Sequence, residues 1–181
     1  IKTKKHEYKE TALHYSIRNK KDPFVKLLLS HEKIDVNKPS EIKEGNDKYI
    51  ETPLYLSVRE NDFEMVKLLL KQPKIDVNIL STNISNDKKY KETALNLAIR
   101  KSYYEIAQLL LKHSDININT IMTIENKEYL SKNKTKEQII HTAVRSGNKD
   151  MVQLILNESK VDINSKSINK KTLDVYDKNS R

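Results

Sequence analysis

Side chains that could carry out chemistry are few in this sequence. It has five histidines, no cysteine and only two glycines among 181 residues. The sequence has no pair of histidines at a metal-binding spacing, no glycine-rich phosphate loop and no nucleophile elbow. Acidic pairs such as Asp22 with Glu32 or Asp62 with Glu64 fall at expected turns and helix starts, where capping and the helix dipole explain them. We therefore expect that the protein is not an enzyme and that it binds no metal and no cofactor. The histidines are His6, His14, His31, His113 and His141.

Regularly spaced arginines are the stronger candidates for binding. Arg18, Arg59, Arg100 and Arg145 follow one another at intervals of 41, 41 and 45 residues. A planar guanidinium can hold a carboxylate through two parallel hydrogen bonds, so a row of arginines could bind an acidic ligand. Alternatively, an arginine near the end of a helix favours the helix dipole and remains solvated. Both interpretations stay open at this point.

The arginine spacing belongs to a repeat that runs along the chain, and such a period is the first signal to seek in a sequence. Each unit begins with a four-residue motif that starts with threonine in three of the four copies, continues with an apolar segment and ends at an asparagine. The first motifs are Thr11-Ala-Leu-His14, Thr52-Pro-Leu-Tyr55, Thr93-Ala-Leu-Asn96 and, more loosely, Gln138-Ile-Ile-His141. The apolar segments are 24–29, 65–70, 106–111 and 151–156, and the asparagines are Asn37, Asn78, Asn119 and Asn164.

Within a unit, apolar and small residues follow a helical spacing. Leu13, Ser16 and Ile17 lie on one helical face, and Val25, Leu28 and Leu29 lie on the next. Two short antiparallel helices are therefore predicted per unit. Such a pair cannot bury its apolar stripe alone, so neighbouring units must stack to form a continuous core.

The turn between the two helices has its own signature. We expect a left-handed backbone at Lys20, Asn61, Ser102 and Gly147, a conformation that suits glycine best. Asp22 is predicted to be the N-cap of an outer helix whose first residue is Pro23.

These motifs resemble the ankyrin repeat family, with its Thr-Pro-Leu-His-like start, its Val-x-x-Leu-Leu outer helix and its Asp-Val-Asn exit. The resemblance covers about Thr3 to Arg181 in four full copies. It implies an all-α fold: a helical solenoid of stacked helix-turn-helix units with long β-hairpin or irregular fingers. We expect a single array over residues 1–181, with units at about 8–48, 49–89, 90–134 and 135–168 and a partial unit at 169–181, in which Leu173 to Tyr176 resemble an opening inner helix.

The units depart from the family pattern in two ways. They are longer than the usual period of about 33 residues, and the excess falls in the fingers at 38–51, 79–92 and 120–137. The histidine that bonds the threonine in this family is present at His14 and His141, but Tyr55 and Asn96 replace it elsewhere, so we expect those two junctions to be held differently. A repeated tyrosine, at positions 8, 49 and 90, is expected to pack at the base of each finger.

The resemblance implies protein binding through a concave groove lined by inner helices and fingers. Residues near the end of each inner helix face this groove in the family, and an arginine ladder there predicts an acidic partner. In this sequence these residues are Arg18, Asn19, Arg59, Glu60, Arg100, Lys101, Arg145 and Ser146.

The third finger adds an apolar stretch. Residues 116–124 alternate weakly as a strand would, which suggests a protruding hairpin. Ile121, Met122, Ile124, Tyr129 and Leu130 could form a contact patch, or they could fold back on the neighbouring finger. Ile84 on the second finger is a weaker candidate of the same kind.

The formal net charge of +9 motivates an alternative, a basic nucleic-acid-associated scaffold. Acidic residues share the fingers with the basic ones, so we expect nucleic acid not to be the partner. No membrane role is expected, because every helix needs its apolar face for stacking. We expect a monomeric adaptor or scaffold in the cytoplasm, although another intracellular or secreted location stays open. It could also be a targeting segment of a larger protein whose activity lies elsewhere.

Overall fold

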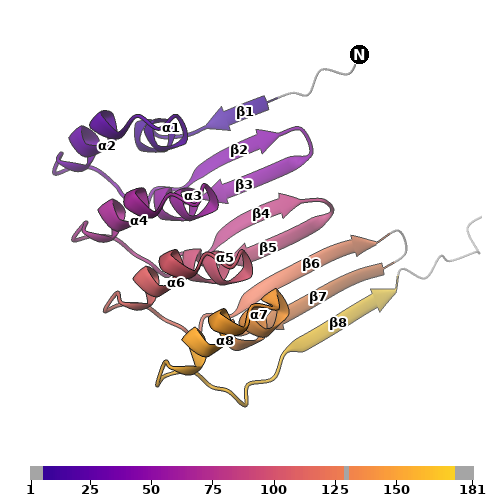
Figure 1. Ribbon diagram of the computed structural model, residues 1–181. Helices are drawn as coiled ribbons and strands as arrows, with labels where there is room; N and C mark the ends of the chain where they lie inside the picture. The colour runs from indigo at the N-terminus through magenta and orange to yellow at the C-terminus, as the bar shows by residue number, and fades with distance from the viewer. Residues whose placement is uncertain (1–5, 129–130, 174–181) are drawn as a thin grey trace, which may run out of the picture.

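Four stacked helix pairs form the body of the molecule. The computed structural model describes residues 6–128 and 131–173 (Figure 1). Within each pair, a seven- or eight-residue inner helix is followed by an eight-residue outer helix. The inner helices are α1 (Ala12–Arg18), α3 (Pro53–Arg59), α5 (Ala94–Arg100) and α7 (Ile139–Ser146). The outer helices are α2 (Asp22–Leu29), α4 (Phe63–Leu70), α6 (Tyr104–Leu111) and α8 (Lys149–Leu156).

The prediction of an all-α fold is wrong, because the fingers form an eight-stranded antiparallel sheet in the order β1 to β8. Each lengthened finger has enough residues for a hydrogen-bonded hairpin, and neighbouring hairpins also pair with each other. In this way most strand edges are satisfied by the next repeat. The strands are β1 (His6–Lys9), β2 (Ser40–Glu44), β3 (Asp47–Glu51), β4 (Ser81–Ser85), β5 (Lys88–Glu92), β6 (Met122–Glu128), β7 (Ser131–Glu137) and β8 (Ile168–Leu173).

The predicted strand character of residues 116–124 is correct only at its end. β6 begins at Met122, and the chain from Ile116 to Ile121 is irregular. The proposed fifth inner helix is also not seen where it can be checked, since Leu173 ends strand β8. The rest of that motif, residues 174–176, lies outside the described residues.

The turns between the paired helices have the backbone conformation that the sequence predicts. Lys20, Asn61, Ser102 and Gly147 have φ angles of 52°, 55°, 58° and 72°, which confirms the left-handed turn in all four repeats. The N-cap of α2 is one residue earlier than predicted: Lys21 holds this position without a side-chain bond, and Asp22 is already helical. One repeat later, the Asp62 side chain does cap α4 and accepts a hydrogen bond from the Met65 amide.

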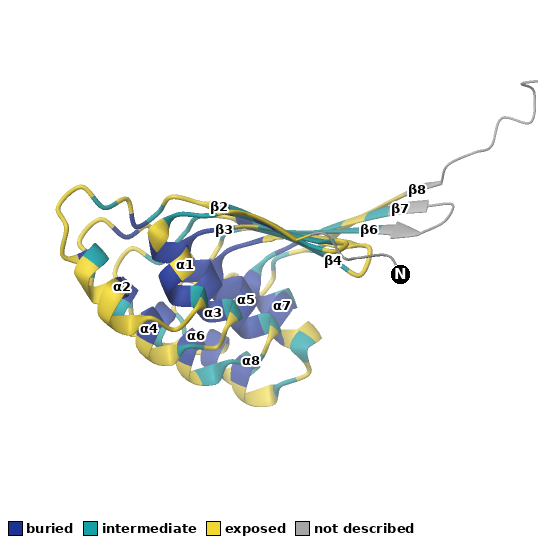
Figure 2. Ribbon diagram, turned by 90° about the horizontal axis from the view of Figure 1, so that it is seen from above, coloured by how far each residue is buried: buried dark blue, intermediate teal, exposed yellow. Residues whose placement is uncertain are grey.

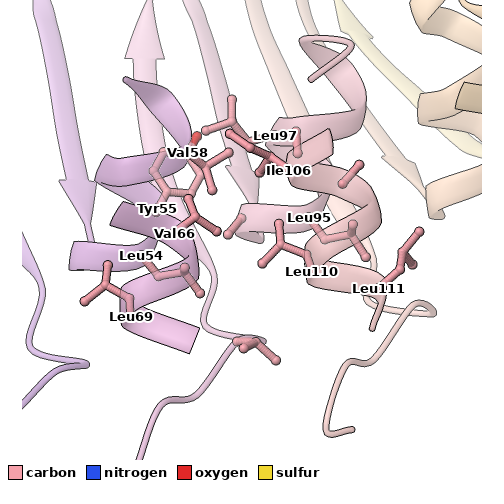
Figure 3. Packing of buried hydrophobic residues seen from close by; sticks show 14 of the residues in the cluster. Leu54, Tyr55, Val58, Val66, Leu69, Leu95, Leu97, Ile106, Leu110 and Leu111 are labelled. Carbon is pink, nitrogen blue, oxygen red and sulfur yellow. The ribbon is translucent and has the colours of Figure 1, made fainter. Parts of the chain in front are cut away.

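The core runs without interruption through all four repeats. Buried apolar side chains extend from Leu13 to Ile155, and each inner helix contacts the inner helix of the next repeat. In the middle repeats, Val58 and Val66 of one pair lie toward Leu97 and Ile106 of the next (Figure 3). The stacking predicted from the helical spacing is therefore confirmed. Burial is concentrated in the helices, while the sheet extends away from them (Figure 2).

Candidate protein-binding groove

Every inner-helix arginine is held by a glutamate eight residues earlier in the chain. Arg59 donates from Nε to Glu51 Oε2 at 3.0 Å and from Nη2 to Glu51 Oε1 at 2.9 Å. Arg18 with Glu10, Arg100 with Glu92 and Arg145 with Glu137 make the corresponding pairs. Glu51, Glu92 and Glu137 each end the second strand of a finger, and Glu10 directly follows β1. Each pair therefore joins the base of a finger to its helix.

A tyrosine covers the guanidinium in three of the four repeats. Arg18, Arg59 and Arg100 lie 4.4, 4.5 and 4.2 Å from the ring centres of Tyr8, Tyr49 and Tyr90 respectively. These distances suit a cation–π interaction. The expectation that the tyrosines pack at the finger base is thus confirmed. We call each set of glutamate, arginine and tyrosine a clamp.

The fourth repeat lacks the tyrosine. Thr135 occupies its place, since it stands opposite Ile124 as Tyr49 stands opposite Ile42. The Arg145 side chain is 59% exposed, against 20% for Arg59. The arginine is therefore more exposed where the ring is missing, although the Glu137 side chain stays buried.

Burial and charge oppose each other inside a clamp. Glu51 is fully buried, and this burial raises the pKa of its carboxyl while the Arg59 charge works against the rise. Burial alone would lower the pKa of Arg59, but the carboxylates of Glu51 and Glu60 reverse that effect and the pKa is raised. A buried pair of this kind depends on both partners, since removing one leaves an uncompensated charge.

The junctions between repeats differ from one another, as the departures from Thr-x-Leu-His predict. His14 Nε2 donates to the carbonyl oxygen of Glu51 in the next repeat at 3.1 Å, and its Nδ1 accepts from the Thr11 hydroxyl at 2.8 Å. The Tyr55 hydroxyl instead reaches across to Glu92 Oε1, at 2.9 Å. Burial and the Glu92 carboxylate raise the pKa of Tyr55 well above its usual value, so the phenol remains a donor.

The third junction lacks a side-chain link of the kind seen for His14 and Tyr55. The Asn96 side chain turns back to Thr93 in a capping box and stays within its own repeat. At this position of the motif, His14 and Tyr55 therefore bond to the next repeat, whereas Asn96 bonds only within its own.

A groove of about 390 Å³ lies between the inner helices and the sheet in the middle repeats. Its walls carry two clamps and several uncharged polar side chains from the second finger. Lys88 and Lys101 contribute exposed charges at its edge. The lining consists of Tyr49, Arg59, Asn83, Ser85, Asn86, Lys88, Tyr90, Leu97, Arg100, Lys101 and Tyr103.

The groove gathers part of the predicted binding set. Arg59, Arg100 and Lys101 line it. Glu60 lies beside it, because its carboxylate is 3.2 Å from Nη1 of Arg59. Asn19 and Ser146 hydrogen-bond to the carbonyls of Tyr15 and Ala143 at the ends of their own helices. Binding of an acidic partner by the arginines stays a prediction. The glutamates that pair with these arginines were not identified from the sequence, although a glutamate stands directly before the start motif in every unit.

The apolar residues of the fingers are dispersed rather than gathered in one patch. Met122 is fully buried, so it is not part of an exposed contact patch. Ile121 is 52% exposed just before β6. Ile84 is half-buried on β4 and lies in a separate hollow with Lys89 and Glu125. Tyr129 and Leu130 lie outside the described residues.

Among residues 6–128 and 131–173, no group of three or more histidine, aspartate or glutamate side chains is placed to hold a metal ion. His14 is occupied by the junction described above. None of the helices in these ranges has the length and apolar character that crossing a bilayer requires.

The sequence profile described as ankyrin repeats (3 copies) matches residues 1–81, 42–122 and 80–167. The chain belongs to the ankyrin repeat family. Ankyrin repeats are generally protein–protein interaction modules and generally have no enzymatic activity. No curated protein matches the chain.

A crystal structure of an ankyrin repeat domain from Acinetobacter baumannii AYE is similar in fold, with a TM-score of 0.53 and 19% sequence identity. The match covers 80% of this ankyrin chain and 60% of that domain, so the chain spans less than two thirds of its length.

Proposed function

We propose that this ankyrin array binds a partner protein through the groove of its middle repeats. The observation that supports this most directly is the pair of clamps that form the groove wall, at Tyr49 with Arg59 and at Tyr90 with Arg100. Tyrosine and arginine are, with tryptophan, the residue types enriched among the interface residues that contribute most to binding energy. The clamps hold them in fixed positions before a partner arrives, which lowers the cost of ordering on binding.

The charge of the groove favours an acidic partner segment. The Glu51 and Glu92 carboxylates are already neutralised by their arginines, and the other charged residues that line the groove are Lys88 and Lys101. Arg18 and Arg145 extend the same row to the outer repeats. Neither a reaction nor a cofactor is part of this proposal, and the chain acts as a single array and as a monomer.

The test reverses charge at the rim and leaves the clamps intact. Reversing Arg59 or Arg100 would place a second carboxylate beside a buried glutamate and disturb the fold. Lys88→Glu with Lys101→Glu changes only exposed side chains. Lys67→Glu with Lys112→Glu makes the same change in net charge on the outer helices, and both of these lysines are also exposed.

Affinity capture from source-cell lysate identifies the retained protein, which is then purified and titrated with each variant. We expect the rim variant to weaken binding at least tenfold, about 1.4 kcal/mol, and the outer-helix variant to bind as the native protein does. Equal binding by the rim variant and the native protein would show that the groove is not the binding site.

A further inference from the structure

The two faces of the sheet differ in composition. Side chains alternate between faces along a strand, and residues directly opposite on paired strands share a face. The three clamp tyrosines therefore lie on the groove face, while their sequence neighbours point outward. We call the outward side the lysine face. Its described lysines are Lys9, Lys43, Lys48, Lys89, Lys91, Lys134, Lys136 and Lys170, and its described acids are Glu7, Glu41 and Glu125.

Contacts between side chains confirm this assignment. Glu125 accepts a hydrogen bond from Lys89 Nζ at 3.2 Å on one side and from Lys134 Nζ at 2.6 Å on the other. Lys43 reaches Glu7 in the same way at 3.1 Å. These lysines and glutamates therefore meet across strands on one surface.

Positive charge is concentrated on β5 to β8. The whole lysine face carries eight described lysines and three described glutamates. Five of those lysines lie on β5, β7 and β8, and the single described acid on this part of the face is Glu125 on β6. Lys91, Lys136 and Lys170 are exposed and make no ion pair among the described residues. Sequence composition alone could not reveal this excess of positive charge, because it counts the acids of both faces together. Glu44 and Asp47, for example, lie on the groove face.

Solubility alone does not account for this arrangement. Lysine is depleted in strands, and proteins use it mainly to protect sheet edges from pairing. Lys89, Lys91, Lys134 and Lys136 instead stand on interior strands, whose edges are already paired. The lysine face thus has a charge density that protection of the edges does not require.

The chemistry of the lysine face fits a planar anionic surface better than a nucleic acid. Every basic residue on the lysine face of the described strands is lysine, a compact point charge, whereas arginine is the usual choice for reading phosphates and bases bidentately. The strand tyrosines that could stack on bases all lie on the opposite face. Neighbouring strands are about 4.8 Å apart, so the charges spread in two dimensions rather than along one line.

The face is also open. The helices lie on one side of the sheet, so the lysine face is not covered by them (Figure 2). Ile168, which is 52% exposed, stands opposite Lys136 on this face and adds an apolar side chain among the lysines.

We propose that the lysine face docks the ankyrin array on an anionic phospholipid membrane, with Lys91, Lys136 and Lys170 as the principal contacts. The groove lies on the opposite side of the sheet and remains free for its partner. This surface needs no amphipathic helix, which is why consideration of the helices alone indicated no membrane role.

The experiment measures sedimentation of the whole chain with phosphatidylcholine vesicles that contain or lack phosphatidylserine. The test variant carries Lys91→Gln, Lys136→Gln and Lys170→Gln. The matched control carries Lys26→Gln, Lys67→Gln and Lys112→Gln, which removes the same charge from exposed positions on the outer-helix side. Far-ultraviolet circular dichroism verifies that all three proteins are equally folded.

We expect binding only to vesicles with phosphatidylserine, and weaker binding at higher salt. A lysine near such a surface contributes about a fivefold change in affinity, so the test variant should lose on the order of a hundredfold. The control should stay close to the native protein.

Three results would overturn the proposal: no binding to the charged vesicles, equal losses in both variants, or equal binding to neutral vesicles. Duplex DNA is tested in parallel at the same salt. Tighter binding to DNA than to vesicles, lost through the same three lysines, would identify nucleic acid as the occupant instead.

Discussion

At the residue scale, the fourth position of the start motif contributes differently to each junction between repeats. His14, Tyr55 and Asn96 follow their threonines by the same spacing, yet His14 bonds a backbone carbonyl of the next repeat, Tyr55 bonds a carboxylate there and Asn96 bonds only its own helix start. The length of the side chain and the position of its polar atom set the difference. The same motif therefore supplies junctions of different chemistry.

His14 should make stability depend on pH. Burial lowers the pKa of His14 below its usual 6.5, so the folded protein resists a proton that the unfolded chain accepts. Its contribution is then fully present above pH 6.5 and is lost as pH falls toward the lowered value, at about 1.4 kcal/mol for each unit of the shift.

The measurement compares urea unfolding of the native protein and His14→Asn across this pH range. Asparagine occupies the same position naturally at Asn96 and does not titrate. We expect the stability advantage of the native protein over the variant to shrink as pH is lowered through 6.5. A constant difference would contradict the lowered pKa.

At the element scale, a left-handed turn links the two helices of every repeat, but only the fourth repeat uses glycine. Ser102 has a φ of 58° and carries a side chain in a region that costs non-glycine residues about 1 to 2 kcal/mol. Gly147 adopts the same conformation, and a methyl group added there would contact nothing within 4 Å. Any loss of stability on replacing Gly147 by alanine therefore comes from the backbone conformation alone.

We expect Ser102→Gly to stabilise the protein by about 0.5 to 1 kcal/mol and Gly147→Ala to destabilise it by about 1 kcal/mol. Removal of the left-handed strain exceeds the extra entropy that glycine gives the unfolded chain. Thermal and urea unfolding of both variants measure these changes. Opposite signs for the pair are the required result, and two changes of the same sign would refute the explanation.

At the scale of the whole molecule, stability depends on contacts between neighbouring repeats. Leu69 of α4 is fully buried among apolar side chains of the middle repeats. We expect Leu69→Ala to destabilise the protein by about 2 to 5 kcal/mol, as truncation of a buried leucine does. Leu27→Ala is the control, because Leu27 occupies an outer helix but is 69% exposed. Urea unfolding should show a loss below about 1 kcal/mol for the control, and a similarly small loss for Leu69→Ala would argue against the stacked core.

The sheet adds a second set of contacts between repeats. Pairing of β3 with β4 and of β5 with β6 joins successive fingers through backbone hydrogen bonds, and a glutamate–arginine pair connects each finger to its inner helix. The groove wall is consequently fixed from both sides. Such an arrangement suits recognition by a preformed surface.

The sequence by itself determined the repeat, the helix pairs, the left-handed turns and the arginine ladder. These features depend on local periodicity and on the backbone preferences of single residues, which four copies make visible. Lysine-rich fingers have no such signal, because their strands are stabilised by pairing with other fingers rather than by an apolar alternation of their own. Only the tertiary structure decided that Arg59 meets Glu51, that Met122 is buried and that lysines collect on one face, since each depends on which residues the assembled sheet brings together.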